Sequence, residues 1–407
     1  MKQYKVLTLG ASGGGKTVFL ASLFKQLSTQ GEHGFFLDVE NHYERKLLNQ
    51  YYTEIVTGDA WPKPTKGTVK EGTFTCSVKT PDLSIHPACK FVYKDYPGGL
   101  LSEIAEDEFS DYNINFNQEV KSADAVLAIL DGQKVLQFLQ GKHDKFLDIW
   151  LHTELANLMH LIQECPKIPV HFIISKWDLI DNHGSFDLSD IRHRLNKIEE
   201  FKNVVKYRNV ADCPIRLIPV SSVGFDFATF QEGSMRKKSE VMPKPFQTEI
   251  PLACVLIDGL QVELKKAIKE QEELAKKNTE VLPDFCILGQ VNNFISGIFL
   301  SLISPNLKKM LPNKYQFDNE TFEQLIKVID KQIVRLEKQA VMTKQEIEKI
   351  ERKAKEESEK LRRKQEQALN KINSETTALG YVVKQFSTIA SKLDKDFPSS
   401  NLGGTGI

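Results

Sequence analysis

The chain has 407 residues, which is more than one ordinary hydrophobic core organises, and we therefore expect two to three domains. Lysine and arginine together number 54, as do aspartate and glutamate, so the net charge favours neither nucleic acid nor an anionic membrane as a partner. The six cysteines are widely spaced, without the pairing of metal or redox sites, which is typical of buried thiols in a reducing compartment. Since the first predicted strand begins within five residues of Met1, leaving no room for a leader, we expect a cytoplasmic protein.

The first motif is a glycine-rich loop between an apolar run at residues 4–9 and a segment of helical character. This order is that of a P-loop between a strand and a helix. Glycines allow successive backbone N–H groups to surround a phosphate, and the start of the helix adds the positive end of its dipole. We expect the Lys16 ammonium to contact the β- and γ-phosphates and the Thr17 hydroxyl to bind Mg²⁺. The predicted nucleotide-binding residues of this loop are Gly10, Ser12, Gly13, Gly14, Gly15, Lys16, Thr17 and Val18.

The helix after this loop is predicted to reach about residue 30, and residues 35–56 are predicted to form a second helix. Residues 57–68 contain two prolines and read as an extended loop. The alternating runs at 73–78 and 89–94 then predict a hairpin of strands around a Pro-Asp turn.

The second strand of that hairpin ends in Asp95-Tyr96-Pro97-Gly98-Gly99. An aspartate at a strand end, followed three residues later by glycine, suits a loop that senses a phosphate. Asp95 can hold Mg²⁺ through water, and the Gly98 N–H can reach a γ-phosphate oxygen that hydrolysis removes.

Three further strands are predicted at 125–130, 169–174 and 215–220, with helical periodicity at 144–163. Alternating strands and helices predict an α/β fold with a mostly parallel sheet flanked by helices, and ligands bind at the carboxyl ends of such strands. The motifs Ser175-Lys176-Trp177-Asp178 and Ser221-Ser222-Val223-Gly224 fall at two of these ends. On the strand before the first of them, His171 is predicted to be a packed core histidine.

Together with the P-loop and the Asp95 to Gly98 motif, these two strand-end motifs make residues 1 to about 278 resemble the translation-factor and Ras-type (TRAFAC) class of P-loop GTPases. The resemblance implies that the Asp178 carboxylate accepts hydrogen bonds from guanine, that the Lys176 stem lies over the base, and that the backbone N–H of Ser222 or Val223 contacts the guanine carbonyl. The donor pattern agrees, because guanine offers N–H groups at N1 and C2, where adenine offers none.

The resemblance further implies that a threonine in the first loop binds Mg²⁺ in the GTP state, and Thr65 matches that position best, with Thr68 second. Lys16, Thr65 and Gly98 are then the predicted catalytic residues, and Thr17, Thr65 and Asp95 the predicted metal ligands.

Two positions depart from the family pattern. Ser175 replaces the usual asparagine, which weakens the expected nucleotide affinity and leaves ATP open as an alternative to GTP. Gly99 stands where many members have the glutamine that orients the attacking water, so we expect slow intrinsic hydrolysis.

The second half of the chain is predicted to be helical. An irregular stretch at 225–250 precedes a last GTPase helix at 252–278, which closes a domain of residues 1–280. Residues 281–317 form a predicted apolar connector whose uncharged portion, 285–307, is long enough to span a bilayer but carries amides that favour burial against protein.

Residues 318–395 are predicted to form a helical coiled-coil region, with an apolar helix at 376–393 that could fold back on the long helix. The uncovered seam needs a coiled-coil partner, either a second copy of the chain or another protein. Residues 396–407 are expected to be a flexible tail without chemistry.

The function predicted from these features is hydrolysis of GTP to GDP and phosphate with Mg²⁺, in which the nucleotide state controls the helical extension or a partner. Two alternatives stay open. One is a nucleotide-binding assembly scaffold with little or no hydrolysis, and the other is a membrane-associated, dynamin-like GTPase.

Overall fold

The structure is a computed structural model, and it describes residues 1–63, 69–101, 118–142, 144–231, 234–238, 240–277 and 366–403. The elements of the first half are β1 (Lys2–Gly10), α1 (Lys16–Leu27), β2 (Phe36–Val39), α2 (His42–Thr57), β3 (Lys70–Lys79), β4 (Ile85–Asp95), a 3-10 turn (Gly98–Leu101), β5 (Ala125–Leu130), α4 (Gly132–Leu139), α5 (Lys145–Ile149), a π-helical turn (Trp150–Leu155) and α6 (Ala156–Glu164). The second half contains β6 (Val170–Ile174), α7 (Trp177–His183), α8 (Leu188–Leu195), α9 (Glu199–Val210), β7 (Ile215–Pro219), β8 (Ala228–Gln231), β9 (Ser234–Lys237), α10 (Ile250–Lys277), α15 (Glu375–Asp396) and a 3-10 turn (Pro398–Ser400).

Seven strands form one mixed sheet in the order β2-β3-β4-β1-β5-β6-β7. The five strands from β4 to β7 run parallel, and β3 is antiparallel to both of its neighbours. The predicted α/β fold with a mostly parallel sheet is therefore confirmed. Because the parallel strands share one direction, their carboxyl ends meet at one edge, where β1 leads into the P-loop and β4 ends at Asp95.

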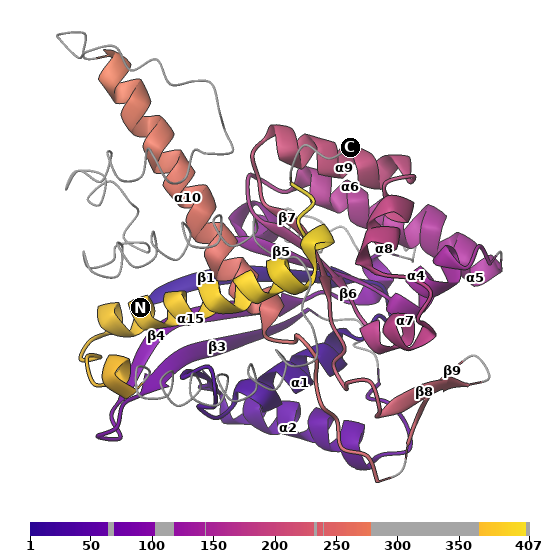
Figure 1. The fold of residues 1–407 in the computed structure, drawn as a ribbon, viewed down its shortest axis with the longest axis horizontal. Helices are drawn as coiled ribbons and strands as arrows, with labels where there is room; N and C mark the ends of the chain where they lie inside the picture. Colours follow the sequence, from indigo (N-terminus) through magenta and orange to yellow (C-terminus); the bar gives the residue numbers. More distant parts are fainter. Residues whose placement is uncertain are drawn as a thin grey trace, which may run out of the picture.

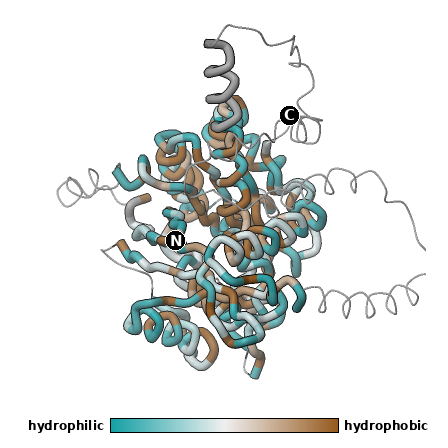
Figure 2. Tube along the Cα trace, turned by 90° about the vertical axis from the view of Figure 1, so that its left-hand side faces the viewer, coloured by the Kyte–Doolittle hydropathy of each residue, from teal (hydrophilic) through white to brown (hydrophobic). Residues whose placement is uncertain are grey.

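Helices cover both faces of this sheet, which gives three layers (Figure 1). Alternate residues of each parallel strand point to opposite faces, as the pleat requires. In β5, Leu127 packs into the core beneath α1, α10 and α15, whereas Ala128 packs into the core beneath α4 to α9. Hydrophobic residues accordingly gather inside the fold in the hydropathy view (Figure 2).

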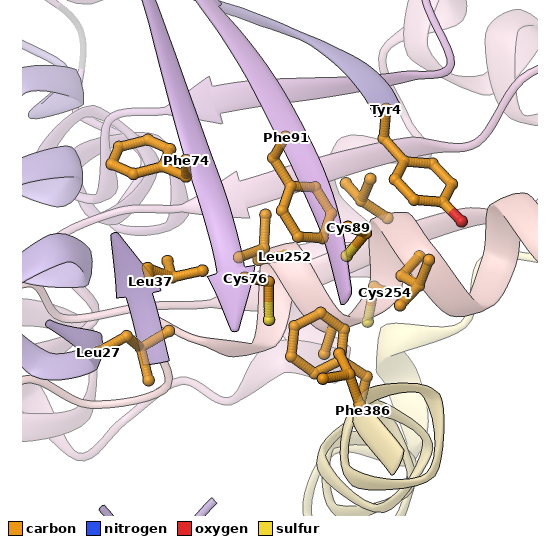
Figure 3. Packing of buried hydrophobic residues seen from close by; sticks show 14 of the residues in the cluster. Tyr4, Leu27, Leu37, Phe74, Cys76, Cys89, Phe91, Leu252, Cys254 and Phe386 are labelled. Atoms are coloured by element: carbon orange, nitrogen blue, oxygen red, sulfur yellow. The ribbon is translucent and has the colours of Figure 1, made fainter. Parts of the chain in front are cut away.

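The helix α15 belongs to the α/β domain. Its Phe386 meets Phe35 edge to face at 4.8 Å between ring centroids and Phe91 of β4 at 6.2 Å (Figure 3). We expected this helix to cover a coiled coil instead. Its apolar face packs on the sheet beside α10, so residues of α10 and α15 belong to one hydrophobic core.

The expectation of a flexible tail is also corrected over residues 396–403. Leu402 is buried, and its N–H donates to the Ile215 carbonyl of β7 at 3.0 Å. Asn401 forms an isolated bridge with Arg216 on the same strand. This short segment covers the edge of the sheet that β7 would otherwise expose.

A buried charged network ties both C-terminal helices to the sheet. Arg216 of β7 donates to both Asp258 carboxylate oxygens, at 2.7 and 3.0 Å, and to Asp394 at 2.6 Å. His171 of β6 is fully buried, as predicted for a core histidine, and its Nε2 lies 2.9 Å from Asp258 Oδ2. Burial alone would raise the pKa of Asp258, but Arg216 and His171 together hold that pKa below its usual range.

Local boundaries differ from the predictions in three places. The segment at 35–56 begins as strand β2 and becomes helix only at His42, where the Asn41 side chain accepts from the Tyr43 N–H and caps α2. The helix α1 ends at Leu27, and the stretch at 225–250 contains the β8–β9 hairpin.

Several predictions for the second half of the chain fall outside the described residues and stay predictions. They are the domain boundary at residue 280, the connector 281–317, the apolar run 285–307 and the coiled-coil helix up to residue 365. Within the ranges that the structure describes, no helix is long and apolar enough to cross a membrane.

Candidate functional site

A cavity of about 420 Å³ lies beside the P-loop, where the carboxyl ends of the parallel strands meet. The lining residues come from the P-loop with the start of α1, the loop after α2, the turn after β4, the segments that follow β5, β6 and β7, and β9. They are Ser12, Gly13, Gly15, Lys16, Thr17, Val18, Trp61, Pro62, Lys63, Gly98, Gln133, Ser175, Lys176, Asp178, Ser222, Val223 and Met235.

The P-loop has the backbone of an anion cradle. Gly15 precedes α1 in the left-handed region with φ +90°, and it offers no side chain to cap the first N–H groups of the helix. The first backbone N–H groups of α1 therefore have no side-chain acceptor and can bind an anion.

Gly10 and Gly14 do not line the cavity and shape the loop instead. A Cβ on Gly10 would approach the Ile129 carbonyl oxygen to 2.8 Å, and the Gly14 N–H donates to the Ala11 carbonyl.

The Lys16 ammonium lies over this loop and donates to the carbonyls of Gly10 at 2.7 Å and Ala11 at 3.2 Å. Burial lowers the pKa of Lys16, and the nearby carboxylates of Asp95 and Glu154 offset part of that shift. A phosphate at the N-terminus of α1 would give this cation a stronger partner than two neutral carbonyls.

Asp95, at the end of β4, is not among the residues that line the cavity. It is buried, its Oδ1 has no hydrogen-bond partner, and burial raises its pKa to about 6. A buried carboxylate with a free oxygen fits a cation, and Mg²⁺ requires only one or two protein oxygens besides phosphates and waters. Thr17, whose side chain is a hydroxyl, is the second candidate ligand that the structure describes here.

Gly98 packs directly against the P-loop. A Cβ at this position would lie 2.1 Å from the Ser12 backbone nitrogen, so any other residue would displace the loop. The 3-10 turn that begins at Gly98 is held from its other end, where the Asn157 side chain donates to the Leu101 carbonyl at 2.9 Å.

Asp178 of α7 also lines the cavity. Its Oδ1 accepts a 2.6 Å hydrogen bond from the Ser221 hydroxyl, which in turn accepts from the Gly224 N–H at 2.9 Å. Its Oδ2 is buried and has no partner. Burial raises the pKa of Asp178, while the bond from Ser221 opposes that rise. The unpartnered oxygen is an acceptor without a donor.

Lys176 is held beside Asp178 in the left-handed region with φ +50°. Its Nζ donates to Asp131 Oδ2 at 2.8 Å, and Asp131 Oδ1 accepts from the Gln133 N–H and caps α4. The ion pair fixes the head of Lys176, so that its stem is the part that can cover a flat ligand.

Ser175 also lines the cavity. Its hydroxyl donates to the Leu130 carbonyl of β5 at 3.1 Å, and a Cβ built on Gly15 would lie 4.0 Å from the Ser175 side chain. The hydroxyl thus bonds to the sheet, and the weaker nucleotide affinity expected from this serine stays a prediction.

The structure thus brings the predicted lining residues Ser12, Gly13, Gly15, Lys16, Thr17, Val18, Gly98, Lys176, Asp178, Ser222 and Val223 together in one cavity. Thr65 and Thr68 lie outside the described residues, so their proposed contact with Mg²⁺ stays a prediction.

The sequence did not predict the wall formed by Trp61, Pro62, Lys63 and Met235. The Trp61 indole N–H donates to the Met235 carbonyl at 2.8 Å, across 174 residues of sequence. A Trp-Pro pair in an extended loop was the only local signal. Ser221, which holds Asp178, was also missed, because nothing in a serine pair tells which hydroxyl faces inward.

Comparisons with known proteins found distant similarities. The chain is similar to a signal recognition particle receptor SRb-GTP/SRX complex from Chaetomium thermophilum, with 17% identity over 55% of this chain and 93% of that chain and a TM-score of 0.33. It is similar to the G domain of the T. maritima FeoB iron transporter, with 15% identity over 54% and 88% of the two chains and a TM-score of 0.26. The S. cerevisiae Ski7 GTPase-like domain bound to GTP is 15% identical over 60% of this chain and 48% of that one, with a TM-score of 0.27.

No protein-family model matches the chain, and no curated protein matches it. The described residues form a mostly parallel α/β sheet with a P-loop after β1 and further cavity-lining segments after β4, β5, β6 and β7.

Proposed function

We propose that this protein binds guanine nucleotide with Mg²⁺ and hydrolyses GTP slowly. The observation that carries the proposal is the buried, unpartnered Oδ2 of Asp178, a residue that lines the same cavity as the P-loop. A buried acceptor without a donor costs free energy, on the order of 1–3 kcal/mol. Guanine would supply N–H donors from N1 and C2 to an ionised carboxylate, and adenine has none at those positions.

The phosphates of the nucleotide would lie in the cradle of Gly13, Gly15 and the first N–H groups of α1. Lys16 would exchange the carbonyls of Gly10 and Ala11 for phosphate oxygens, where its charge stabilises the transferring phosphoryl group. Thr17 and Asp95 would hold Mg²⁺, with Thr65 or Thr68 joining in the GTP state. The metal neutralises charge that develops on the phosphate oxygens.

Slow turnover is expected because Gly99 has no side chain to orient the attacking water. The same residue favours the second candidate function, a nucleotide-binding scaffold with little or no hydrolysis. Single-turnover measurements with excess protein over GTP separate the two. Phosphate release that Lys16→Ala abolishes supports the GTPase, whereas bound GTP that persists unchanged supports the scaffold.

We further propose that the nucleotide state is relayed to the segment between α10 and α15. Both helices pack on the sheet that carries the P-loop and the Asp178 loop, and Arg216 joins them through Asp258 and Asp394. The partner of the predicted coiled coil, a second copy or another protein, would read that state.

We also propose that the protein is cytoplasmic. The five described cysteines are buried and form no disulfide with one another, which fits a reducing environment.

The decisive experiment is competition between nucleotides for the purified full-length protein in the presence of Mg²⁺. GDP and GTP should displace a fluorescent guanine nucleotide at least about tenfold better than ADP and ATP, because each unmade hydrogen bond to a charged group costs roughly 1.5–3 kcal/mol. Asp178→Ala should remove the preference. Equal competition by adenine nucleotides would contradict the proposal.

A further inference from the structure

The loop that presents Asp178 rests on the C-terminal segment of the chain. Trp177 lies between Lys176 and Asp178, is buried, and is absent from the cavity lining. Its ring meets the ring of Phe397 edge to face, at 5.7 Å between centroids and an interplanar angle of 88°. Such an arrangement is favourable for aromatic pairs. Phe397 therefore supports this loop from the side away from the cavity.

Phe397 also supports the second segment that fixes Asp178. Its ring lies 6.4 Å from that of Phe246 at an angle of 72°. Phe246 and Ser221 exchange two backbone hydrogen bonds, of 2.7 and 3.1 Å, and the Ser221 hydroxyl holds Asp178. Two routes of contact thus lead from one phenylalanine to one carboxylate.

Phe397 is itself held from both directions. Its N–H donates to the Leu393 carbonyl of α15 at 2.8 Å, and its carbonyl accepts from Ser400 at 2.9 Å. The Arg216 to Asp394 ion pair fixes the end of α15 to β7, and Leu402 bonds to the same strand. Since Phe397 packs against both hydrophobic cores, its position depends on the fold as a whole.

We propose that Phe397 is a positioning residue for base recognition: it holds Trp177 and Phe246 so that the free oxygen of Asp178 faces the base, and the selectivity for guanine depends on this contact. The proposal rests on the guanine-nucleotide binding proposed above. Removing the ring opens space behind Trp177, and both supports of Asp178 can then shift. A hydrogen bond depends on alignment, so the bonds to the base edge weaken, whereas the phosphate contacts at the P-loop stay.

The test compares affinities for GDP and inosine diphosphate, measured with Mg²⁺ on the full-length protein. Inosine lacks the 2-amino group, so the ratio of the two affinities reports one of the two hydrogen bonds to Asp178. For the unaltered protein we expect GDP to bind about tenfold more tightly than inosine diphosphate, because one hydrogen bond to a charged group contributes roughly that factor in affinity. Phe397→Ala should lower this ratio at least about threefold.

Phe386→Ala is the matched control. It truncates the same residue type within α15, the helix that Phe397 follows as C-cap, but Phe386 packs against Phe35 and Phe91, away from Trp177. It should lower the melting temperature and leave the GDP-to-inosine ratio unchanged. Phe397→Leu, which fills part of the space, should give an intermediate ratio and provides a folded variant if the alanine variant aggregates.

The outcomes separate this inference from the function on which it rests. A ratio that stays at the unaltered value in Phe397→Ala and Phe397→Leu overturns the positioning role, as does an equal fall in Phe386→Ala. If the unaltered protein does not bind GDP, or does not prefer it over inosine diphosphate, the proposed function fails first.

Discussion

Ser221 and Asp178 are 43 residues apart and share a buried hydrogen bond of 2.6 Å between hydroxyl and carboxylate. The bond occupies one oxygen of Asp178 and leaves the other without a partner. The serine therefore fixes the carboxylate through Oδ1 and leaves Oδ2 as an acceptor for one N–H group of a base. Because each carboxylate oxygen has two lone pairs, Oδ1 can still accept from the adjacent N–H group.

The first prediction concerns the chemistry of that acceptor. Asp178→Asn replaces one carboxylate oxygen by an amide NH₂, which repels the guanine 2-amino group but can donate to the 2-oxo group of xanthine. GDP affinity should fall about tenfold or more, and xanthosine diphosphate should become the better ligand. Competition binding with both nucleotides measures the exchange. Unchanged GDP affinity would mean that Asp178 does not contact the base.

The second prediction concerns the serine. Ser221→Ala removes the hydrogen bond that, among the described residues, the Asp178 carboxylate accepts from another side chain, and the second buried oxygen then lacks a side-chain donor. We expect the nucleotide-free protein to lose about 1–3 kcal/mol of unfolding free energy and GDP affinity to weaken.

Ser222→Ala serves as its control. The neighbouring Ser222 also lines the cavity, but the contact proposed for it uses its backbone N–H, which the substitution keeps. Denaturant unfolding and GDP titration should be near the unaltered values for this variant. A loss in Ser222→Ala as large as that in Ser221→Ala would contradict the roles assigned here.

Much of the candidate site could be predicted from sequence because its motifs are local. The P-loop lies within eight residues of chain, and Asp95 and Asp178 follow recognisable strands. The wall that includes Trp61 and Met235 could not be predicted, since it joins residues 174 apart through a hairpin with no motif. Periodicity found the amphipathic helix α15, but not the surface that it covers. Phe386 would suit a coiled coil or a sheet equally well, and only tertiary packing decides between them.

The third prediction tests the contact between Gly98 and the P-loop. Gly98→Ala would place a Cβ 2.1 Å from the Ser12 backbone nitrogen, so the turn at 98–101 must move away. We expect single-turnover GTP hydrolysis to fall about tenfold or more, because a shift of this size disrupts the alignment of reacting groups. Gly31→Ala is the control, since a Cβ there meets nothing within 4 Å. Equal hydrolysis by the two variants would contradict a role for Gly98.

The fourth prediction is a dependence of stability on pH. Burial lowers the pKa of His171, whose Nδ1 has no partner, so the folded protein keeps this imidazole neutral while the unfolded chain protonates it near pH 6.5. The unfolded state then binds more protons, and the unfolding free energy falls as the pH drops below about 6.5. Asp258, whose pKa is also lowered, adds a loss of the same sign at more acidic pH.

His171→Gln should flatten this dependence. Chemical denaturation at several pH values from 7.5 to about 5 measures it, and the slope of the unaltered protein should exceed that of the variant below pH about 6.5. The variant is also expected to be less stable at neutral pH, because the hydrogen bond to Asp258 changes. Parallel slopes would show that His171 is not the group responsible.

The last prediction concerns the wall of the cavity. The Lys237 ammonium donates to the carbonyls of Glu54, Gly58 and Ala60 at 2.7, 2.7 and 2.8 Å, and lies 5.0 Å from the centre of the Trp61 ring. It therefore fastens the end of α2 and the following loop to the β8–β9 hairpin. Lys237→Met keeps much of the stem but loses the charge and these bonds.

With that tether gone, Trp61 should leave the cavity more often and bound GDP should escape faster, by about tenfold if the loss amounts to one net hydrogen bond to a charged group. Release is followed by chasing a fluorescent nucleotide with excess GDP. Lys238→Met, at the exposed neighbouring position, should release GDP at the rate of the unaltered protein.

Tryptophan fluorescence gives a second measurement. Trp150 and Trp177 are buried and Trp61 lines the cavity, so a fluorescence change on GDP binding should come from Trp61 and be lost in Trp61→Phe. A Lys237→Met variant that holds GDP as long as the unaltered protein would mean that the hairpin does not control this wall.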